Sequence, residues 1–415
     1  MSMKRDPVCR IFAAGCISIL VLTLAIGAQD RQRVIAIGDV HGGYSEFTAI
    51  LQRVGLIDAG FEWTGGSATL VQIGDVMDRG AQARACLDLL IKLKQRAVKA
   101  RGKVIPLIGN HEAMNLMHDL RYVTPDIYKT FSTNASEEVR GKAYRDYVRF
   151  LSAHRGHSHA AVAAEDEAAQ RKWMDAHPPG FFEYCDAFGP GGKYGRWVRQ
   201  NQVIVQIDDG IFVHGGLNPS LPFRNLAELD AQVHSDLEAC DSLWESLADR
   251  RIIWRYMTLN EAMQQVAEEF QWMRARGRSE DADAVDQMYR FLALGNSLTI
   301  STDGPLWYRG LAESPEEQLA SELKAMLARL KARYVVSGHT VQSKSDITIR
   351  FEGRVFLIDT GMLKEAFGGR ASALEIQDGQ FTAYYTDREP RVLVAPAAKK
   401  AGRPITQQPA GKVVR

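Results

Sequence analysis

Short runs of apolar and β-branched residues recur along the chain, and a glycine follows the early ones. The first three runs cover residues 34–37, 70–73 and 104–108. Runs of this length that are bounded by turn residues predict buried β-strands. Between them, residues 84–98 place apolar side chains at near-helical spacing, and residues 44–54 are also predicted to be helical. The alternation of strand and helix predicts an α/β arrangement for this part of the chain.

Two long helical stretches interrupt the pattern of strands. Residues 113–199 are polar and irregular, whereas residues 225–300 are rich in large apolar side chains that we expect in a core. We expect both stretches to be inserts in a single domain that spans residues 33–390. Further short runs predict strands at residues 203–205, 211–213, 334–336, 347–351, 355–358, 373–376 and 381–385. Residues 395–415 have no pattern of this kind, which predicts a disordered tail.

Side chains that commonly bind metals stand directly after several of these strands. In α/β proteins, ligands bind at the carboxyl ends of the strands, so we expect these side chains to converge. One Asp-rich turn, such as residues 74–80, is more often a hydrogen-bonded loop, and it is the repetition of the pattern that favours a site. The side chains at the strand ends are Asp39, His41, Asp75, Asn110, His111, His214 and His339.

The chemistry of this set points to bound metal ions. Oxygen and imidazole ligands without a thiolate suit Mn, Fe or Zn better than a structural zinc site. The set is too large for one tetrahedral ion, which predicts two ions that share a carboxylate. Two such ions generate hydroxide at neutral pH and clamp both oxygens of an in-line displacement. Arg79 and Arg309 have planar guanidinium groups suited to phosphate, so the set predicts phosphoester hydrolysis.

Composition narrows the class of protein further. The apolar share is 46% and the charged share 24%, as in a globular protein with a core. A net charge of +1, with no basic stripe, gives no electrostatic basis for nucleic-acid binding. Beyond the N-terminal segment, Cys86, Cys185 and Cys240 allow at most one disulfide, which excludes a disulfide scaffold.

The N-terminal 28 residues differ from the rest of the chain. Lys4, Arg5 and Arg10 precede an almost wholly apolar stretch, residues 11–28, which ends in small residues. This order is typical of a signal peptide, so we expect export, to the bacterial periplasm. The alternative is that residues 11–28 remain as a membrane anchor, since their length just suffices to span a bilayer. No other part of the chain is expected to contact a membrane.

Five motifs, taken in order, resemble the signature of the calcineurin-like metallophosphoesterases. The Asp78-Arg79-Gly80 at the end of the second motif points to the phosphoprotein phosphatase branch of that family. The motifs are Gly38-Asp39-Val40-His41-Gly42, Gly74-Asp75 through Gly80, Gly109-Asn110-His111-Glu112, His214-Gly215-Gly216 and Gly338-His339.

Within that branch, the chain looks like the bacterial-type Shewanella-like protein phosphatases. A second histidine that is common in the last motif of the wider family is absent, and Val341 stands in its place, in agreement with the phosphatase branch. The resemblance spans about residues 33–386. The segments that match this subgroup are residues 110–123, 304–310, 359–362 and 368–369.

The resemblance implies a fold and a role for each residue. The implied fold is α/β, an α+β sandwich of two mixed β-sheets packed face to face and flanked by helices. Two divalent ions (Mn, Fe or Zn) are the implied cofactors, with a bridging hydroxide that attacks phosphorus in line. The implied metal ligands are Asp39 and His41 for the first ion, Asp75 as the bridge, and Asn110, His214 and His339 for the second ion. His111, oriented by Asp78, is the implied proton donor to the leaving oxygen, and Arg79, Arg309 and Asn110 are implied to bind phosphate.

Three functional hypotheses follow from the sequence. The first is a phosphatase of phosphorylated proteins that acts on phosphotyrosine or on phosphoserine and phosphothreonine. The second keeps the fold but acts on small phosphoesters or dinucleoside polyphosphates. The third is a metal-binding module without catalysis, against which the intact ligand set argues, since convergent buried carboxylates are costly to keep.

Overall fold

The structure is a computed structural model that describes residues 32–154, 167–275 and 281–396. The predicted signal peptide or anchor, residues 1–28, lies outside the described residues. The same is true of the predicted tail beyond residue 396.

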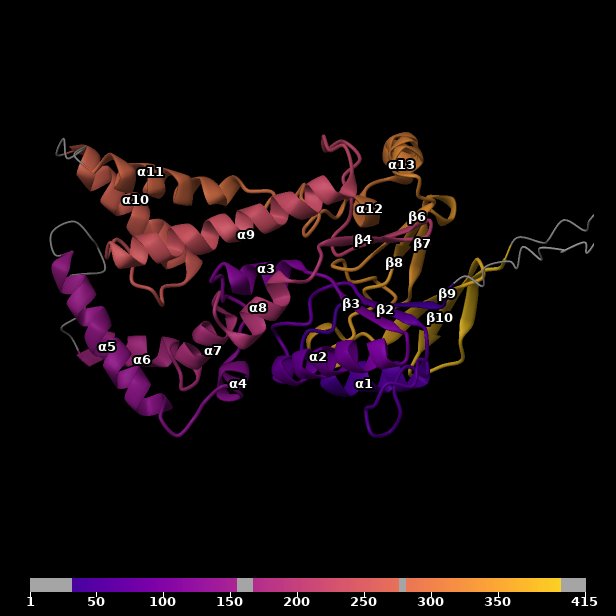
Figure 1. Ribbon diagram of the computed structural model, residues 1–415, viewed down its shortest axis with the longest axis horizontal. Helices are drawn as coiled ribbons and strands as arrows, with labels where there is room; N and C mark the ends of the chain where they lie inside the picture. The colour runs from indigo at the N-terminus through magenta and orange to yellow at the C-terminus, as the bar shows by residue number, and fades with distance from the viewer. Residues whose placement is uncertain (1–31, 155–166, 276–280, 397–415) are drawn as a thin grey trace, which may run out of the picture. The chain divides into compact units, whose positions relative to one another are not determined.

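The first sheet has six strands: β1 (Val34–Ile37), β2 (Thr69–Gln72), β3 (Lys103–Pro106), β9 (Ser372–Gln377), β10 (Gln380–Tyr385) and β11 (Arg391–Val394). Their order across the sheet is β11-β10-β9-β1-β2-β3, and Figure 1 labels β2, β3, β9 and β10 of this sheet. β1, β2 and β3 are parallel, and Thr69 of β2 lies opposite both Val34 and Lys103. β9 runs antiparallel to β1, and β10 and β11 continue the sheet in antiparallel fashion.

The second sheet has five strands: β4 (Ile204–Ile207), β5 (Gly210–Val213), β6 (Tyr334–Ser337), β7 (Thr348–Arg350) and β8 (Val355–Leu357). Their order is β4-β5-β6-β8-β7, with β5, β6 and β8 parallel and both edge strands antiparallel. Both sheets are therefore mixed. At one side they are joined, because the N–H of Ile108 after β3 donates to the carbonyl of Gln202 before β4 at 2.9 Å.

The two sheets pack face to face through a shared apolar core. Val71 from the first sheet and Phe212 from the second are fully buried in it. Phe381 of β10 stacks on Phe356 of β8 with ring centroids 4.4 Å apart and an angle of 4° between the planes. Aromatic and β-branched side chains suit this layer, because they fill the space between two pleated surfaces. The predicted sandwich of two mixed sheets is confirmed.

Helices cover the outer faces of the sandwich. The outer face of the first sheet packs against α1 (Tyr44–Arg53) and α2 (Ala83–Lys99), close to the bounds that spacing predicts. α13 (Glu316–Leu330) covers the second sheet, with Leu323 and Leu327 in the same cluster as strand residues Ile211 and Val335. Short elements complete the domain, namely α12 (Gly310–Glu313), η3 (Phe351–Gly353) and α14 (Lys364–Phe367).

Two groups of helices correspond to the stretches expected as inserts. Trp254 belongs to the second group, and its ring centroid lies 5.1 Å from that of Tyr147 and 6.1 Å from that of Trp173 in the first group, so an aromatic contact joins the two groups. Trp244 and Met288 are buried, as their spacing predicts. The first group is α3 (Asn110–Leu116), α4 (Pro125–Lys129), α5 (Ser136–Ala153), α6 (Glu167–Ala176), α7 (Phe181–Phe188) and α8 (Lys193–Arg199). The second is α9 (Leu226–Asp249), α10 (Leu259–Ala275), α11 (Ala282–Ala293) and η2 (Leu294–Asn296).

One strand is not predicted from the sequence. β11 lies at the edge of its sheet, where Arg391 and Val392 are exposed, so it lacks the buried apolar run by which the other strands are detected.

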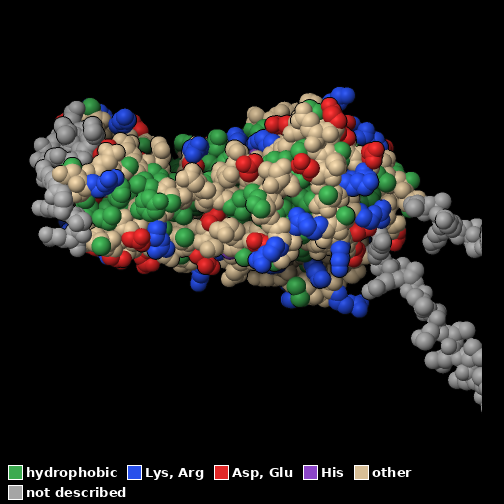
Figure 2. Space-filling model, turned by 90° about the horizontal axis from the view of Figure 1, so that it is seen from above, with side chains coloured by type: hydrophobic (Ala, Val, Ile, Leu, Met, Phe, Trp, Pro, Cys, Tyr) green, Lys and Arg blue, Asp and Glu red, His purple; other side chains and the backbone are tan. Residues whose placement is uncertain are grey.

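Within residues 32–154, 167–275 and 281–396, no helix combines the length and the apolar character that a membrane span requires. Figure 2 shows basic and acidic side chains interspersed on one face, in keeping with the net charge of +1.

Candidate active site

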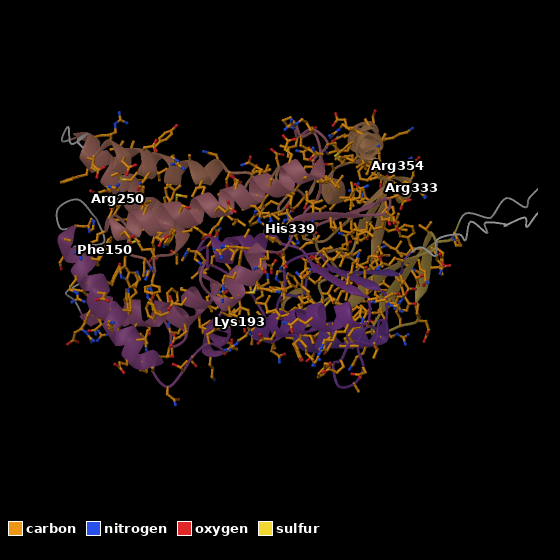
Figure 3. All side chains as sticks on the ribbon, viewed as in Figure 1. Phe150, Lys193, Arg250, Arg333, His339 and Arg354 are labelled. Carbon is orange, nitrogen blue, oxygen red and sulfur yellow. The ribbon has the colours of Figure 1, made fainter. Side chains whose placement is uncertain are left out.

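The strand ends of the two sheets bring the predicted side chains together. Asp39 and His41 follow β1, Asp75 follows β2, and Asn110 opens α3 directly after β3. His214 follows β5, and its Nε2 lies 3.3 Å from Asp75 Oδ1, so the two sheets meet here. Figure 3 labels His339, which follows β6 and lies where the sandwich meets the helical inserts. All the predicted metal-type side chains are buried, with exposed fractions between 0% and 7%.

The turn after β2 packs directly against the turns on either side of it. Gly74 has φ +98°, and a Cβ at this position would lie 2.6 Å from the backbone nitrogen of Gly109. Only glycine permits that approach. On the other side, the carbonyl of Asp75 accepts hydrogen bonds from the N–H groups of Val40 and His41, both at 2.9 Å. The three turns after β1, β2 and β3 therefore form one continuous hydrogen-bonded surface.

Several of the predicted site residues have a left-handed backbone conformation. The left-handed region costs a non-glycine residue about 1–3 kcal/mol and persists only where the surroundings enforce it. Such conformations cluster at functional sites, because they aim a side chain where regular structure would not. The predicted site residues with positive φ are His41 (47°), Asp75 (55°), Asp78 (67°), Arg79 (64°) and His339 (63°).

One group of potential metal donors consists of His41, Asp75 and His111, whose ligand atoms lie within 4.8 Å of one another. His41 Nε2 is 3.6 Å from Asp75 Oδ2 and 3.9 Å from Asp39 Oδ2. His41 Nδ1 contacts the carbonyl of Met77 at 2.9 Å, so Nδ1 carries the hydrogen and Nε2 offers a lone pair. Asp39 thus stands beside this group, as the resemblance implies.

A second group consists of Asp75, His214 and His339, again within 4.8 Å. His214 Nδ1 contacts the carbonyl of Ile73 at 2.9 Å, which leaves Nε2 as the free lone pair. That lone pair faces Asn110 Oδ1 at 2.8 Å. Asp75 belongs to both groups, and this is the position predicted for a bridging carboxylate.

Three observations indicate that these residues could hold divalent cations. Two acceptors, His214 Nε2 and Asn110 Oδ1, face each other with no hydrogen between them when Nδ1 carries the imidazole proton. His339 Nε2 is buried and has no hydrogen-bond partner among the described residues. Asp39 and Asp75 are buried carboxylates within one site. A cation relieves all three, since buried acceptors and carboxylates are otherwise costly.

The electrostatic environment keeps two of the imidazoles neutral. Burial lowers the pKa of His41 to about 3 against the opposing attraction of Asp75. Burial and the neighbouring His214 lower the pKa of His339 to about 2. A neutral imidazole is the form that ligates a metal. Burial, with the carboxylates of Asp359 and Asp75, raises the pKa of Asp39 well above its ordinary value, which marks the crowding of negative charge that a cation would offset.

His111 is held by a carboxylate and by the helix that it opens. Its Nδ1–H donates to Asp78 Oδ2 at 2.6 Å. The other ring nitrogen, Nε2, lies 3.9 Å from Asp75 Oδ2. Burial lowers the pKa of His111, but Asp75 and Asp78 outweigh burial and raise it above its ordinary value. Asn115, one helical turn further along α3, donates to Asp78 Oδ1 at 3.0 Å and to the carbonyl of His111 at 2.8 Å. Tyr184 of α7 donates in turn to Asn115.

Glu112 has a positioning role that the sequence does not reveal. Its buried carboxylate accepts the N–H groups of Gly109 (2.9 Å) and Asp75 (2.7 Å), from two different turns. It also accepts from Val76 (2.9 Å) and Met77 (3.2 Å). The four bonds fasten the turn after β2 to the start of α3. Glu112 belongs to the third motif, Gly109-Asn110-His111-Glu112, but only the tertiary structure shows what its carboxylate oxygens contact.

Asp359 and Asn115 are further residues to which the sequence assigns no role. Asp359 follows β8, as Asp39 follows β1, so the strand-end pattern was the available signal. Its carboxylate accepts the N–H of Gly361 at 3.0 Å. Burial raises the pKa of Asp359 to about 6. No comparable signal marks Asn115, which is one of several polar residues in a helix.

The two predicted phosphate-binding arginines are placed differently. The Arg79 guanidinium lies 4.6 Å from the ring centroid of Tyr122 and 5.2 Å from that of Phe367, and its Nε is buried without a partner among the described residues. Arg309 is half-buried, and its Nη1 donates to the carbonyl of His339 at 2.9 Å and to Thr340 Oγ1 at 3.0 Å. The Arg309 guanidinium thus fastens the turn after β6 by hydrogen bonds, whereas the Arg79 guanidinium lies between two aromatic rings.

Comparison with known proteins agrees with this geometry. Residues 32–343 match the family model described as calcineurin-like phosphoesterase. "Shewanella-like protein phosphatase 2" of Arabidopsis thaliana is 34% identical over 195 residues, which cover 46% of this chain and 47% of that protein. "Shewanella-like protein phosphatase 1" of Plasmodium berghei is 26% identical over 334 residues, 80% of this chain and 67% of that protein.

A solved structure shares the fold. The crystal structure of the cold-active protein-tyrosine phosphatase of a psychrophilic Shewanella species aligns with a TM-score of 0.54 at 22% identity, over 88% of this chain and 81% of that one. The family model covers well over half of the chain and includes every predicted site residue. This protein therefore belongs to the calcineurin-like phosphoesterase family and is a hydrolase of phosphate esters.

Proposed function

We propose that this protein is a metal-dependent phosphoprotein phosphatase that hydrolyses phosphomonoesters. The observation that carries the proposal is the hydrogen-bonded pair of Asp78 and His111, which faces two donor groups that share Asp75. A proton donor beside a cation site is what the departure of an ester oxygen from phosphorus requires. The relatives named protein phosphatases support a phosphorylated protein as the substrate.

Two divalent ions (Mn, Fe or Zn) are held, in this proposal, by the strand-end side chains. When bound, they neutralise phosphate charge and lower the pKa of water, so that hydroxide is available near neutral pH. The contribution of the chain is pre-organisation, because backbone carbonyls fix the rings of His41 and His214 before any ion arrives. Asp39, His41 and Asp75 would hold one ion, and Asp75, Asn110, His214 and His339 the other.

The phosphate group is held by Arg79, with help from Asn110 and Arg309. Arg79 has an unpaired buried Nε, and two aromatic rings restrict its guanidinium to one region. A guanidinium that is already ordered loses little entropy when it binds two phosphate oxygens. Arg309 keeps the turn after β6 in place, which orients His339.

Hydrolysis forms one bond to phosphorus and breaks another. The oxygen of water bonds to phosphorus while the ester oxygen leaves on the opposite side, and the water proton passes to solvent. His111 Nε2 donates its proton to the leaving oxygen, which departs as an alcohol or a phenol. Asp78 keeps Nδ1–H in place and stabilises the charged imidazolium from which the proton comes.

A phosphatase assay on the full chain tests the proposal. The protein is stripped of metal, supplied with Mn, Fe or Zn, and given phosphotyrosine and phosphothreonine peptides beside a dinucleoside tetraphosphate. We expect metal-dependent release of phosphate from at least one peptide and its loss in His111→Asn. Cleavage of the dinucleotide alone would contradict a protein substrate but keep the mechanism. Bound metal with no turnover of any ester would support the binding module instead.

We also propose that the protein acts outside the cytoplasm, on the basis of residues 1–28. Three basic residues precede the apolar stretch of residues 11–28, an order that directs export. Fractionation of cells that produce the full chain with a C-terminal tag tests this. We expect the tag in the periplasm, and a tag confined to the cytoplasm would contradict the proposal.

A further inference from the structure

A chain of hydrogen bonds runs behind the Asp78–His111 pair. Asp78 Oδ2 accepts from His111 Nδ1 at 2.6 Å, and Asp78 Oδ1 accepts from Asn115 Nδ2 at 3.0 Å. The Tyr184 hydroxyl donates in turn to Asn115 Oδ1. All four side chains are buried, with exposed fractions between 0% and 3%. The chain therefore connects α7 to the side chain that we propose as the proton donor.

The oxygens around Asn115 fix the direction of its carboxamide. Its amide nitrogen faces two acceptors, Asp78 Oδ1 and the carbonyl oxygen of His111, the latter at 2.8 Å. If the amide were turned over, its oxygen would face both of these oxygens, and the contacts would be repulsive. Oδ1 therefore points to Tyr184, and the phenol must act as the donor. Burial, with the nearby carboxylate of Asp78, raises the pKa of Tyr184 well above its ordinary value, so the phenol keeps this proton.

Packing within the first group of helices holds the Tyr184 ring. Its centroid lies 5.2 Å from that of Tyr128 and 5.0 Å from that of Phe131, both in edge-to-face arrangements. Phe188, one turn further along α7, lies 4.6 Å away. Three aromatic contacts restrict the ring, so its hydroxyl meets Asn115 at a fixed point.

We infer that Asn115 and Tyr184 are positioning residues for proton transfer, which hold the Asp78 carboxylate in the orientation that aims His111 at the leaving oxygen. This inference rests on the proposed function. A carboxylate turns readily about its last side-chain bond, because that torsion has broad minima. Here His111 holds one oxygen of Asp78 and Asn115 holds the other, so the carboxylate cannot turn without breaking both bonds. Asn115 also bonds the carbonyl of His111, so a single amide contacts both members of the pair.

The loss of one bond in this chain should slow proton transfer by a measurable factor. A hydrogen bond between neutral groups corresponds to roughly twofold to tenfold, and one to a charged group to roughly tenfold to a hundredfold. We expect Tyr184→Phe to lower kcat for an alkyl phosphate by about threefold to tenfold, and Asn115→Ala by about tenfold to a hundredfold. KM should change little, since Arg79 is the side chain proposed to hold the phosphate. With para-nitrophenyl phosphate, whose leaving oxygen needs no proton, both losses should nearly disappear.

The rival explanation is that Tyr184 only fills the core of the helical insert. The loss of its hydroxyl would then lower the activity by the same factor with both esters. A double-mutant cycle separates the two explanations. If Tyr184 acts through Asn115 and His111, Tyr184→Phe should cost nothing further in a chain that already carries Asn115→Ala or His111→Asn. A defect of packing would persist in both backgrounds.

The kinetic experiment uses the metal-loaded full chain and its variants Tyr184→Phe and Asn115→Ala. Steady-state rates with an alkyl phosphate and with para-nitrophenyl phosphate give kcat and KM, and elemental analysis gives the bound metal. Tyr128→Phe is the matched control, because it removes a hydroxyl from a buried ring beside Tyr184 that lies outside the chain of hydrogen bonds. We expect full metal content in every variant and wild-type kinetics in Tyr128→Phe.

Nuclear magnetic resonance gives a readout that does not depend on turnover. The Nδ1 proton of His111, which is donated to Asp78, should give a downfield signal in the Zn-loaded full chain with labelled histidine, and this signal should vanish in His111→Asn. Successive hydrogen bonds polarise one another, so the signal should shift or broaden in Tyr184→Phe and in Asn115→Ala. It should stay unchanged in Tyr128→Phe.

Each outcome decides a different claim. Equal losses for both esters in Tyr184→Phe, or the same loss in the His111→Asn background, overturn the positioning role and leave the proposed phosphatase intact. A wild-type signal with wild-type kinetics in Tyr184→Phe overturns it as well. If the full chain hydrolyses neither ester but the signal shifts as expected, the hold on the Asp78–His111 pair stands and the proposed phosphatase falls. Tyr184→Phe keeps the ring, so it decides the question even where Asn115→Ala does not fold.

Discussion

Two parts of the candidate site, which we call the floor and the rim, differ in how their side chains are held. The rim consists of the partly exposed Tyr122 and Phe367. The floor is the buried strand-end set, that is Asp39, His41, Asp75, Asn110, His111, His214 and His339. Floor side chains are buried, and their positions are set by backbone carbonyls, carboxylates and each other, as with His41 on Met77 and His111 on Asp78. The rim side chains contact floor imidazoles through tilted ring pairs, Tyr122 with His111 at 5.0 Å and Phe367 with His41 at 5.3 Å between centroids, and Tyr122 is 38% exposed. In the proposed function, the floor would supply the chemistry that every phosphoester shares, and the rim would contact the rest of the substrate.

This difference predicts how strongly a substitution in each part of the site affects activity. A floor residue has several partners, and removing it leaves buried polar groups unsatisfied, so the loss is large and general. A rim residue makes weaker contacts and is partly exposed, so its replacement should lower activity slightly and by an amount that depends on the substrate. The predictions below test this distinction, from the largest expected effect to the smallest.

Asp75→Asn should have the largest effect. Asp75 belongs to both donor groups, so its replacement removes the charge that both ions require. We expect bound metal, measured by elemental analysis, to fall and phosphatase activity to drop below detection, while circular dichroism stays native. Asp126→Asn, an exposed aspartate on α4, is the control. Full metal content and activity in Asp75→Asn would show that the two groups are independent of their shared carboxylate.

His111→Asn should lower kcat without loss of metal. Removing a general acid costs about 10²–10⁴-fold, and less for an ester whose leaving oxygen needs no proton. We expect a much smaller fall with para-nitrophenyl phosphate than with an alkyl phosphate. Because Asp78 acts through the imidazole, the double variant with Asp78→Asn should be little worse than His111→Asn alone. Equal losses for both esters would argue against proton donation by His111.

Glu112→Gln should loosen the floor without removing any donor. The amide has one acceptor oxygen in place of two, so some of the four N–H groups that the carboxylate binds lose their partner. We expect metal affinity to fall about 10- to 100-fold and the free energy of unfolding to fall by about 1–3 kcal/mol. Metal titration and denaturant unfolding measure the two effects. Glu137→Gln, at an exposed position on α5, should change neither.

Arg309→Ala should have the smallest of these effects. One guanidinium nitrogen already donates to the carbonyl of His339 and to Thr340, so the residue is half committed to the protein. We expect a rise in KM of about threefold to tenfold with little change in kcat, against a larger rise for Arg79→Ala. Steady-state kinetics with one phosphopeptide measures both. A larger loss in Arg309→Ala than in Arg79→Ala would reverse our ranking of the two arginines.

Most of the sandwich could be predicted from its buried strands. The apolar run of residues 34–37 matches β1 residue for residue, and the other strand predictions differ from the structure by one or two residues at one or both ends. β11 is missed because an exposed edge strand has no buried face to impose a pattern. The bounds of α3 also differ, since it begins at Asn110 and not after the motif.

The candidate site was predictable to the extent that it lies at strand ends. The residues expected there converge, because parallel strands carry their carboxyl ends to one edge. Glu112, Asn115 and Tyr184 were not assigned roles, since the partners of a buried polar side chain come from distant parts of the chain. The roles of the floor residues in binding metal and substrate remain predictions for the experiments above.

The sequence by itself determined the identity of the strands, the order of the motifs and the type of ligand chemistry, because these are local properties of spacing and residue type. Only the tertiary structure decided that Asp75 is shared by two donor groups, that Glu112 fastens two turns, and that Tyr122 and Phe367 flank Arg79. The physical reason is that a side chain's partners depend on which turns the two sheets bring into contact. That contact is set by the packing of the whole core.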